Sequence, residues 1–347
     1  MKAKARVPDP RGEQPERLAA NEAGCGRISL RCASMRRKIA LASPGIRGMS
    51  AKEGREMRRI ISALSVILTA AILGSPVQAQ AQIRYVIMIV LENTNAQDAK
   101  SQPFMGGILP KAAYLNNMQA VAHPSQPNYL AMVGGSTFGV TDDADHDVNA
   151  SHLGNLMGGQ HWWVYAEDYP GYYGYCFTGE QSGNYVRKHN PFMSFTNVNT
   201  QPYGYCANIV NASNFAVDAA NNQLSRFSLY IPNLQNDGHD TGVAFADNWL
   251  QTTWGPYLES DSFMADKLVI ITFDEDDGTS NNLIYTSLLG PGIASGAVSQ
   301  RQYNHYSLLR LVEDIFRVGS LGRNDATAAQ INDIWTTVPF TPRAKVR

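Results

Sequence analysis

The chain has 347 residues and a formal net charge of -1, with 44% hydrophobic and 17% charged residues. This composition is typical of a folded protein with one large or two average domains, and it excludes a chain that is disordered over most of its length. Residues 1–59 hold 15 of the 29 Lys and Arg residues but 6 of the 30 Asp and Glu residues, which leaves 14 basic against 24 acidic residues in 60–347. Because such an acidic body repels nucleic acid, we expect no nucleic-acid partner.

An apolar stretch ahead of the acidic body predicts a secretory signal peptide. Residues 57–59 (MRR) are basic, the 14 residues 60–73 are uncharged and mostly apolar, and small residues around Ala79 and Ala81 fit a cleavage site. Fourteen residues are too few to cross a bilayer, which takes about 20, so we expect no membrane span in the mature protein. A buried core helix is the alternative. We favour export, to the periplasm or to the medium.

The sequence therefore divides into three parts. Residues 1–56 are rich in Arg, Ala and Gly without apolar periodicity, so we expect them to be disordered or to precede the true start, at Met49 or Met57. Residues 57–81 form the expected signal peptide, and 82–347 form one folded domain.

Cysteine usage agrees with export. Cys25 and Cys32 lie in the upstream part, which leaves Cys176 and Cys206 in the body. Because an exported pair can oxidise, we predict a Cys176–Cys206 disulfide, worth about 3–4 kcal/mol on the chain-entropy model. Two separate buried thiols are the alternative.

The body alternates strand-like and helix-like segments without a long linker, which predicts a single α/β domain with a mostly parallel central sheet flanked by helices. Continuous apolar runs predict buried strands at 84–91 and 268–273, and shorter strands are expected at 162–165 and 227–231. Helices are expected at 105–116, 128–133, 148–157, 215–223, 243–258 and 306–318, and surface loops at 169–175 and 289–295.

The first and last of these strands end in acidic or amide side chains. These are Glu92 and Asn93 after the first strand, and Asp274 and Glu275 after the last. Because ligands bind outside the carboxyl ends of parallel strands, we expect the four side chains around one point. They would repel one another unless a divalent cation neutralised them, so we predict a metal site. Asp276 and Asp277 come next and fit solvated charges in a surface loop.

Residues 123–131 (HPSQPNYLA) predict the start of a helix. Pro127 fits the first turn, which places Ser125 near a helix N-terminus, where free N–H groups and the dipole favour an anion. This geometry suits a hydroxyl that attacks a phosphoryl group, and Asn128 would donate to a phosphate oxygen. A plain helix start with Ser125 as its cap is the alternative.

Two further motifs carry histidines or cations. Residues 232–240 (PNLQNDGHD) follow a predicted strand, and His239 is a candidate metal ligand or proton donor. Residues 187–192 (RKHNPF) offer Lys188 and His189 as phosphate-binding groups. His305 opens the last helix and is either a binding group or a structural one, while a structural role is favoured for His146, His152 and His161.

Six motifs together resemble a known family. They are LENTN at 91–95, HPSQPNYLA at 123–131, RKHNPF at 187–192, PNLQNDGHD at 232–240, ITFDED at 271–276 and NHYSLLRLVED at 304–314. In this order they resemble the bacterial phosphoesterase family, which contains acid phosphatases and phospholipases C. The resemblance covers nearly all of residues 84–318.

The resemblance implies an alkaline-phosphatase-like fold and a serine nucleophile assisted by a divalent metal cation. Glu92 with Asn93, and Asp274 with Glu275, match the family's metal-binding pairs. Ser125 stands where the superfamily has its Ser or Thr nucleophile, and His239 matches an active-site histidine. Alkaline phosphatases proper use more histidine ligands, so the number and identity of the metal ions stay open.

The expected activity is hydrolysis of a small phosphate monoester through a phosphoserine. Ser125 attacks phosphorus, water then hydrolyses the intermediate, and His239, or else His123, protonates the leaving oxygen. The substrate-binding residues are Asn128, Lys188, His189 and His305.

Three alternatives stay open. A phosphodiesterase of the phospholipase C kind would use the aromatic residues of 169–175 as an apolar rim. A metal-independent serine hydrolase would use Ser125 or Ser136. A binding protein without activity would hold calcium through Asp142, Asp143, Asp145 and Asp147.

Overall fold

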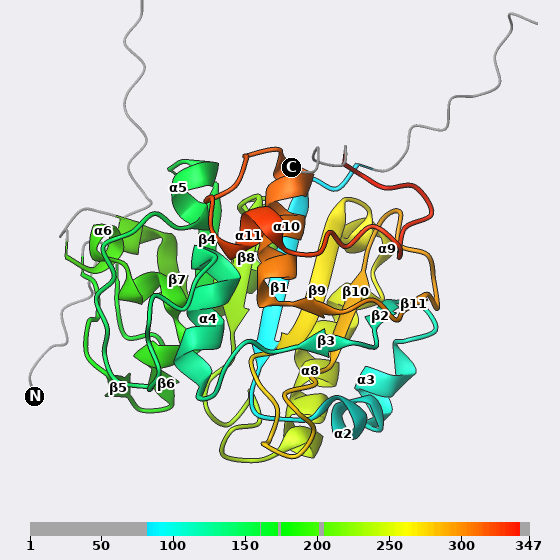
Figure 1. The fold of residues 1–347 in the computed structure, drawn as a ribbon, viewed down its shortest axis with the longest axis horizontal. Helices are drawn as coiled ribbons and strands as arrows, with labels where there is room; N and C mark the ends of the chain where they lie inside the picture. Colours follow the sequence, from blue (N-terminus) through cyan, green and yellow to red (C-terminus); the bar gives the residue numbers. More distant parts are fainter. Residues whose placement is uncertain (1–81, 160, 173–174, 201–204, 341–347) are drawn as a thin grey trace, which may run out of the picture. The chain divides into compact units, whose positions relative to one another are not determined.

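The computed structural model describes residues 82–159, 161–172, 175–200 and 205–340 (Figure 1). The expected signal peptide and the segment upstream of it lie outside the described residues. Among the described residues, no helix has the length and apolar character needed to cross a membrane.

The core of the domain is an eight-stranded sheet in the order β11-β2-β10-β9-β1-β8-β4-β7. Its strands are β1 (Tyr85–Leu91), β2 (Ala113–Leu115), β4 (Trp162–Ala166), β7 (Ile209–Asn211), β8 (Phe227–Ile231), β9 (Lys267–Phe273), β10 (Thr286–Leu289) and β11 (Val298–Ser299). All pairings are parallel except those of β10, which runs antiparallel to β9 and β2. Two small sheets pair β3 (Met118–Gln119) with β12 (Tyr303–Asn304) and β5 (Gln181–Ser182) with β6 (Tyr185–Val186).

Short helices and turns connect the strands. The α-helices are α2 (Ala96–Lys100), α3 (Pro103–Gly107), α4 (Ser125–Gly134), α5 (Leu153–Met157), α6 (Thr196–Asn199), α7 (Phe215–Ala220), α8 (Val243–Leu258), α9 (Asp261–Met264), α10 (His305–Phe316) and α11 (Asn324–Thr327). The 3-10 turns are η1 (Arg187–His189), η2 (Pro191–Ser194), η3 (Tyr205–Asn208) and η4 (Ala212–Asn214).

Helices cover both faces of the sheet. On one face, α4, α5 and α10 contact one another, and α4 and α10 lie in front of the sheet in Figure 1. Trp162 of β4 points to this face and stacks on Phe192 of η2, with ring centroids 4.2 Å apart. Since side chains alternate along a strand, Tyr165 points to the other face, where its ring meets Phe215 of α7. The prediction of an α/β domain with a mostly parallel sheet between helices is confirmed.

The strand predictions agree with the structure to within one residue at each end, because each is a run of apolar residues buried between two layers. β1 pairs in parallel with a strand on either side, Met88 facing Leu229 of β8 and Ile270 of β9. Among the helices, 243–258 is confirmed in full as α8.

Three helix predictions extend three or more residues beyond the helix observed. The helix expected at 105–116 ends at Gly107, and Ala113–Leu115 instead form β2, paired with β10 and β11. The helix expected at 148–157 begins only at Leu153, because Val148 bridges to Phe195. The helix expected at 215–223 ends at Ala220. In the first two cases, pairing with a distant segment outweighs the local pattern.

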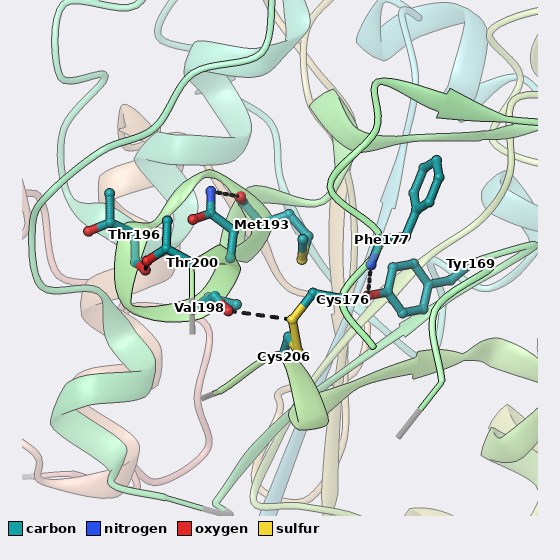
Figure 2. The surroundings of a disulfide bond; sticks show 9 residues. Tyr169, Cys176, Phe177, Met193, Thr196, Val198, Thr200 and Cys206 are labelled. Atoms are coloured by element: carbon teal, nitrogen blue, oxygen red, sulfur yellow. Dashed lines mark hydrogen bonds between the residues drawn. A yellow bond between two sulfur atoms is a disulfide. The ribbon is translucent and has the colours of Figure 1, made fainter. Parts of the chain in front are cut away.

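Cys176 and Cys206 form the predicted disulfide, with Cα atoms 5.7 Å apart (Figure 2). The bond joins the segment that follows Tyr169 to η3, which leads into β7 at the edge of the sheet. The Cys176 sulfur lies 3.7 Å from the Val198 carbonyl oxygen, and the Phe177 N–H donates to the Tyr169 hydroxyl (3.3 Å). The alternative of two separate thiols is wrong.

Candidate active site

Acidic residues gather at the carboxyl ends of three adjacent parallel strands. Glu92 follows β1, Asp274 follows β9, and Asp237 lies in the loop after β8. The Asp274 N–H donates to the Leu91 carbonyl (3.0 Å) and the Glu92 N–H donates to the Asp237 carbonyl (3.0 Å), so backbone bonds fix the three segments side by side. All three acidic side chains are buried.

Ser125 stands at the start of α4, against two of the acids. Its hydroxyl lies 3.1 Å from Oε2 of Glu92 and 3.1 Å from Oε1 of Glu275. A hydroxyl carries one hydrogen, so it donates to one carboxylate at a time, and two carboxylates at one oxygen repel each other. The arrangement therefore favours a further positive charge beside Ser125.

A second group of ligand atoms lies on the other side of Glu92. Glu92, His189 and Asp237 each offer one such atom, and these atoms lie within 4.8 Å of one another. The two nitrogens of His189 are 3.4 Å from Oε1 of Glu92 and 3.4 Å from Oδ2 of Asp237. Tyr129, one turn after Ser125 on α4, donates its hydroxyl hydrogen to Glu92 and stacks on the His189 ring at 5.2 Å.

Several polar atoms here are buried without a hydrogen-bond partner. They are both ring nitrogens of His189, Oδ2 of Asp237, Oδ2 of Asp274 and Oδ1 of Asn93. Buried polar atoms are normally paired, so each unpaired one needs an explanation. Carboxylate and amide oxygens with one imidazole form a donor set for a divalent cation, and a bound cation would satisfy these atoms. The residues present fit such an ion.

The electrostatics agree with the donor set. Burial, followed by the charges of Asp274 and Asp237, raises the pKa of Glu92 well above its usual value. Burial, and then Glu275, raises the pKa of Asp274, and burial raises that of Asp237 to about 7. Burial lowers the pKa of His189, which keeps its ring neutral and able to bind a metal.

Glu275 links the nucleophile to a histidine. One of its oxygens accepts the Ser125 hydroxyl, and the other pairs with Nδ1 of His123. The other ring nitrogen of His123 lies 3.3 Å from Oδ1 of Asp276. About half of the His123 side chain is exposed, so part of the ring faces solvent. Both oxygens of Glu275 thus contact protein side chains.

The prediction that Asp276 is a solvated surface charge is wrong. Its side chain is buried and accepts hydrogen bonds from Gly278, Ser280 and Asn282. These bonds lower its pKa, although burial opposes them. Asp276 therefore fixes the loop after β9 as well as His123.

Asn128 and His305 do not occupy the places expected of substrate-binding groups. The Asn128 amide donates to Ala122 and Pro124 and accepts from Val121 and Ala122, so the loop before α4 uses its donors and its acceptor. His305 is buried, and its Nε2 bonds the Asp274 carbonyl at 2.5 Å. Burial lowers the pKa of His305 to about 4. Both side chains bond backbone groups next to the site.

His189 also differs from its prediction. It is fully buried between Glu92 and Asp237, so it lies among the candidate metal ligands and cannot reach a phosphate from the solvent side. Lys188, its neighbour, remains partly exposed and pairs with Asp143 at 2.8 Å. The charges of Asp143, Glu92 and Asp274 raise the pKa of Lys188 although burial opposes them, so its ammonium stays charged.

His239 lies at the outer side of the acidic group. Its ring centroid is 6.0 Å from that of His189, and its Nδ1 contacts Asp240 at 2.8 Å. Its backbone N–H donates to the Asp237 carboxylate. About a third of the side chain is exposed.

The calcium-binding alternative and the Ser136 form of the serine-hydrolase alternative lose their support. The carboxylates proposed to hold calcium have other partners instead: Asp145 and Asp147 pair with Arg187, Asp143 pairs with Lys188, and Asp142 contacts the His146 ring. Ser136 lies in the turn after α4, where its hydroxyl accepts from the Phe138 N–H. Within the described part of the chain, no hydrogen bond joins it to a histidine or an acid.

Tyr129 and Asp237 belong to the site but were not predicted from the sequence. Tyr129 follows Ser125 by four residues, which places both on one face of a helix. Asp237 lies in the same strand-end motif as His239. The helical spacing of Tyr129 and the motif position of Asp237 both point to the site, but neither residue type alone indicates a role there.

The comparison with protein families shows the family of this chain. Residues 108–319 match the model of the phosphoesterase family. The chain belongs to the phosphoesterase family. The predicted resemblance is thereby confirmed, and at the level of this family so is the prediction of a hydrolase acting on phosphoric esters.

Three proteins of known sequence are similar to most of this chain. A probable acid phosphatase of Kluyveromyces lactis is 37% identical, over 78% of this chain and 67% of its own. An acid phosphatase of Aspergillus fumigatus is 36% identical, over 69% of this chain and 56% of its own. A phosphatidylinositol-3-phosphatase of Mycobacterium tuberculosis is 33% identical, over 84% and 99%. The chain thus spans between about half and two thirds of these two fungal relatives.

The chain also has a partial likeness to a solved structure. A Vibrio parahaemolyticus protein of the alkaline phosphatase superfamily superposes with a TM-score of 0.49 and 12% identity, covering 71% of this chain and 70% of its own.

Proposed function

We propose that this protein is an exported, metal-dependent phosphomonoesterase of the acid phosphatase type, with Ser125 as its nucleophile. One observation carries the proposal: the Ser125 hydroxyl lies 3.1 Å from the buried carboxylates of both Glu92 and Glu275 at the start of a helix. Backbone N–H groups at a helix start, together with the dipole, favour the anion that such a hydroxyl attacks.

Glu92, His189 and Asp237 would hold a divalent cation, because one ligand atom of each lies within 4.8 Å of the others. We add Asn93 and Asp274 to this set, because each has a buried oxygen without a hydrogen-bond partner at the end of the adjacent strands β1 and β9. When bound, the cation would lower the pKa of the nucleophile and neutralise charge on the phosphoryl oxygens. The sequence predicted Glu275 as a metal ligand. Because its carboxylate joins the Ser125 hydroxyl to the His123 ring, we assign it to proton transfer instead.

The protein residues move the protons. Ser125 Oγ forms a bond to phosphorus as the bond to the leaving oxygen breaks; Glu275 takes the hydroxyl proton, and His123 gives a proton to the leaving oxygen. Water then attacks the phosphoserine, His123 takes a proton from it, and Ser125 regains its proton from Glu275. Lys188 faces the charge of the transferring group.

His123 replaces His239 as the favoured acid. Glu275 contacts both Ser125 and His123, so nucleophile and acid share one carboxylate. His239 instead pairs with Asp240. His239 remains the alternative donor, beside the candidate metal ligands.

Phosphate monoesters are the favoured substrates. The relatives named above are two acid phosphatases and one phosphatidylinositol-3-phosphatase. One observation supports the phospholipase C alternative. The exposed rings of Tyr172 and Tyr175 stack on each other, with centroids 5.2 Å apart.

Kinetic assays test the proposal. p-Nitrophenyl phosphate, bis-p-nitrophenyl phosphate and phosphatidylcholine are compared, with and without chelator, on wild type, Ser125→Ala and the matched control Ser136→Ala. We expect monoester hydrolysis that chelation removes, that divalent ions restore, and that Ser125→Ala but not Ser136→Ala abolishes. Full activity after chelation contradicts the metal, and an active Ser125→Ala contradicts the nucleophile.

Export is part of the proposal. A disulfide in the body agrees with an oxidising compartment. N-terminal sequencing of protein recovered outside the bacterial cytoplasm should begin just after Ala79 or Ala81. Ile67→Arg interrupts the apolar run and should leave the protein uncleaved inside the cell. Equal export of that variant contradicts the signal peptide and with it the division at residue 82.

A further inference from the structure

A carboxylate occupies donor groups beside the nucleophile. Oδ1 of Asp143 accepts from the backbone N–H of Gln126 at 3.0 Å, and Oδ2 accepts from the Lys188 ammonium at 2.8 Å. Gln126 directly follows Ser125 in α4, and Pro127 has no N–H. The first turn therefore offers the N–H groups of Ser125 and Gln126 as its backbone donors, and Asp143 takes the second.

These donors are the ones that a phosphate group next to Ser125 would use. N–H groups at a helix start bind phosphate and carboxylate alike, and an ammonium pairs with either. The ammonium of Lys188 also lies within the electrostatic reach of Glu92 and Asp274. An anion that enters the site therefore meets a carboxylate already bound to the same groups.

The loop that carries Asp143 is fixed to α4. The side-chain amide of Gln126, oriented toward two carbonyls, donates to Asp142 (3.3 Å) and Ala144 (2.7 Å), the residues on either side of Asp143. The backbone is held while the carboxylate, about 29% exposed, is free to rotate out. Of the four aspartates at 142–147, Asp143 is the one whose side chain reaches α4; the others pair with His146 or Arg187.

We propose that Asp143 is an internal competitor of the substrate phosphate. Its carboxylate occupies the Gln126 N–H and the Lys188 ammonium in the free enzyme, and a phosphate group must displace it to bind. This inference rests on the proposed function. Its consequence is weaker binding of substrate and of inorganic phosphate together, so that product leaves sooner.

Asp143→Asn tests the competition, because the amide keeps an acceptor for Gln126 but loses the charge. We expect the KM for p-nitrophenyl phosphate and the inhibition constant of inorganic phosphate both to fall, by about 3- to 5-fold, as for the loss of a partly exposed ion pair. If the asparagine variant does not fold, Asp143→Ser tests the same prediction, because it removes the carboxylate with little steric change. If Asp143 has only a structural role, both constants should rise instead, because disordering the loop weakens the binding of phosphate.

Asp142→Asn is the matched control: it removes the same charge from the neighbouring residue, which pairs with His146 and does not reach α4. It should leave both constants within about 2-fold of wild type. Unchanged or raised constants in Asp143→Asn and Asp143→Ser overturn the inference.

Calorimetric titration with inorganic phosphate separates this inference from the proposed function. If wild type hydrolyses no ester, the proposed function fails, but tighter phosphate binding by Asp143→Asn still supports the competitor. Equal or weaker binding refutes it.

Discussion

The Ser125 hydroxyl and the Glu275 carboxylate are hydrogen-bonded at 3.1 Å across 150 residues of sequence. Glu275→Gln keeps the shape of this contact but removes the proton acceptor and the charge that holds His123. We expect kcat to fall by about 10²- to 10⁴-fold, the usual share of general acid–base catalysis, with KM changed less. Steady-state kinetics on p-nitrophenyl phosphate measures both.

Asp277→Asn is the control for that variant. Asp277 lies two residues further on, and its carboxylate bonds Asn95 and Thr279 rather than the nucleophile. Its replacement should leave kcat near wild type. A Glu275→Gln variant as active as Asp277→Asn would remove Glu275 from the proton path.

Tyr129 predicts a separate effect on metal binding. Its hydroxyl bonds Glu92 and its ring stacks on His189, so it orients two candidate ligands at once. Loss of such an orienting partner typically costs about 10–100-fold in metal affinity. In Tyr129→Phe, the metal concentration for half-maximal activity should rise by that factor while activity at saturating metal stays closer to wild type.

Tyr165→Phe is the matched variant, because Tyr165 also donates from a buried hydroxyl to a carboxylate, that of Asp218, at 3.0 Å. It should cost about 1 kcal/mol of unfolding free energy without changing the metal requirement. Equal metal requirements in the two variants would show that Tyr129 acts on stability alone.

His152 predicts how stability depends on pH. Burial lowers the pKa of its ring to about 4, against 6.5 in an unfolded chain. Between pH 6.5 and pH 4 the ring binds a proton in the unfolded chain but not in the native state, so the free energy of unfolding falls as the pH falls. The loss is about 2 kcal/mol between pH 7 and pH 5 from this residue.

Urea unfolding of His152→Asn at both pH values measures that loss. Asparagine retains a capping acceptor for the Gly154 N–H at the start of α5. The variant should be less stable at pH 7 but show a shallower fall toward pH 5. His161→Asn, at an exposed position, should follow the wild-type fall. If the slope of His152→Asn equals that of wild type, the pH dependence has another source.

The disulfide predicts a loss of stability on reduction. Cys176 and Cys206 are 30 residues apart in sequence, and closing such a loop stabilises by about 3–4 kcal/mol on the chain-entropy model. Cys176→Ser with Cys206→Ser should unfold at lower denaturant concentration by that free energy, and a reductant should then have no further effect. A reductant-sensitive double variant would contradict this account.

The sequence predicted the sheet better than the side-chain roles. β1 and β9 are read from their composition, because a strand covered on both faces must be apolar throughout. Ala113–Leu115 was placed in a helix because its pairing with β10, more than 170 residues further on, leaves no local trace.

The candidate site was predictable where residue type and strand end coincide, as for Glu92 and Asp274. It was not predictable where a side chain turns back on its own loop, as Asn128 does, since spacing carries no information on side-chain direction. The burial of His189 and Asp276 likewise depends on segments far away in the chain.

The separation in sequence between Glu92 and Glu275 has a consequence for folding. Ser125 meets both only after β9 has docked beside β1, a non-local step of the kind that makes folding slow. A nascent or partly folded chain therefore carries neither the nucleophile's partners nor an assembled cation-binding group. Enzyme activity should therefore appear together with the last long-range contacts, so that a partly folded chain is inactive.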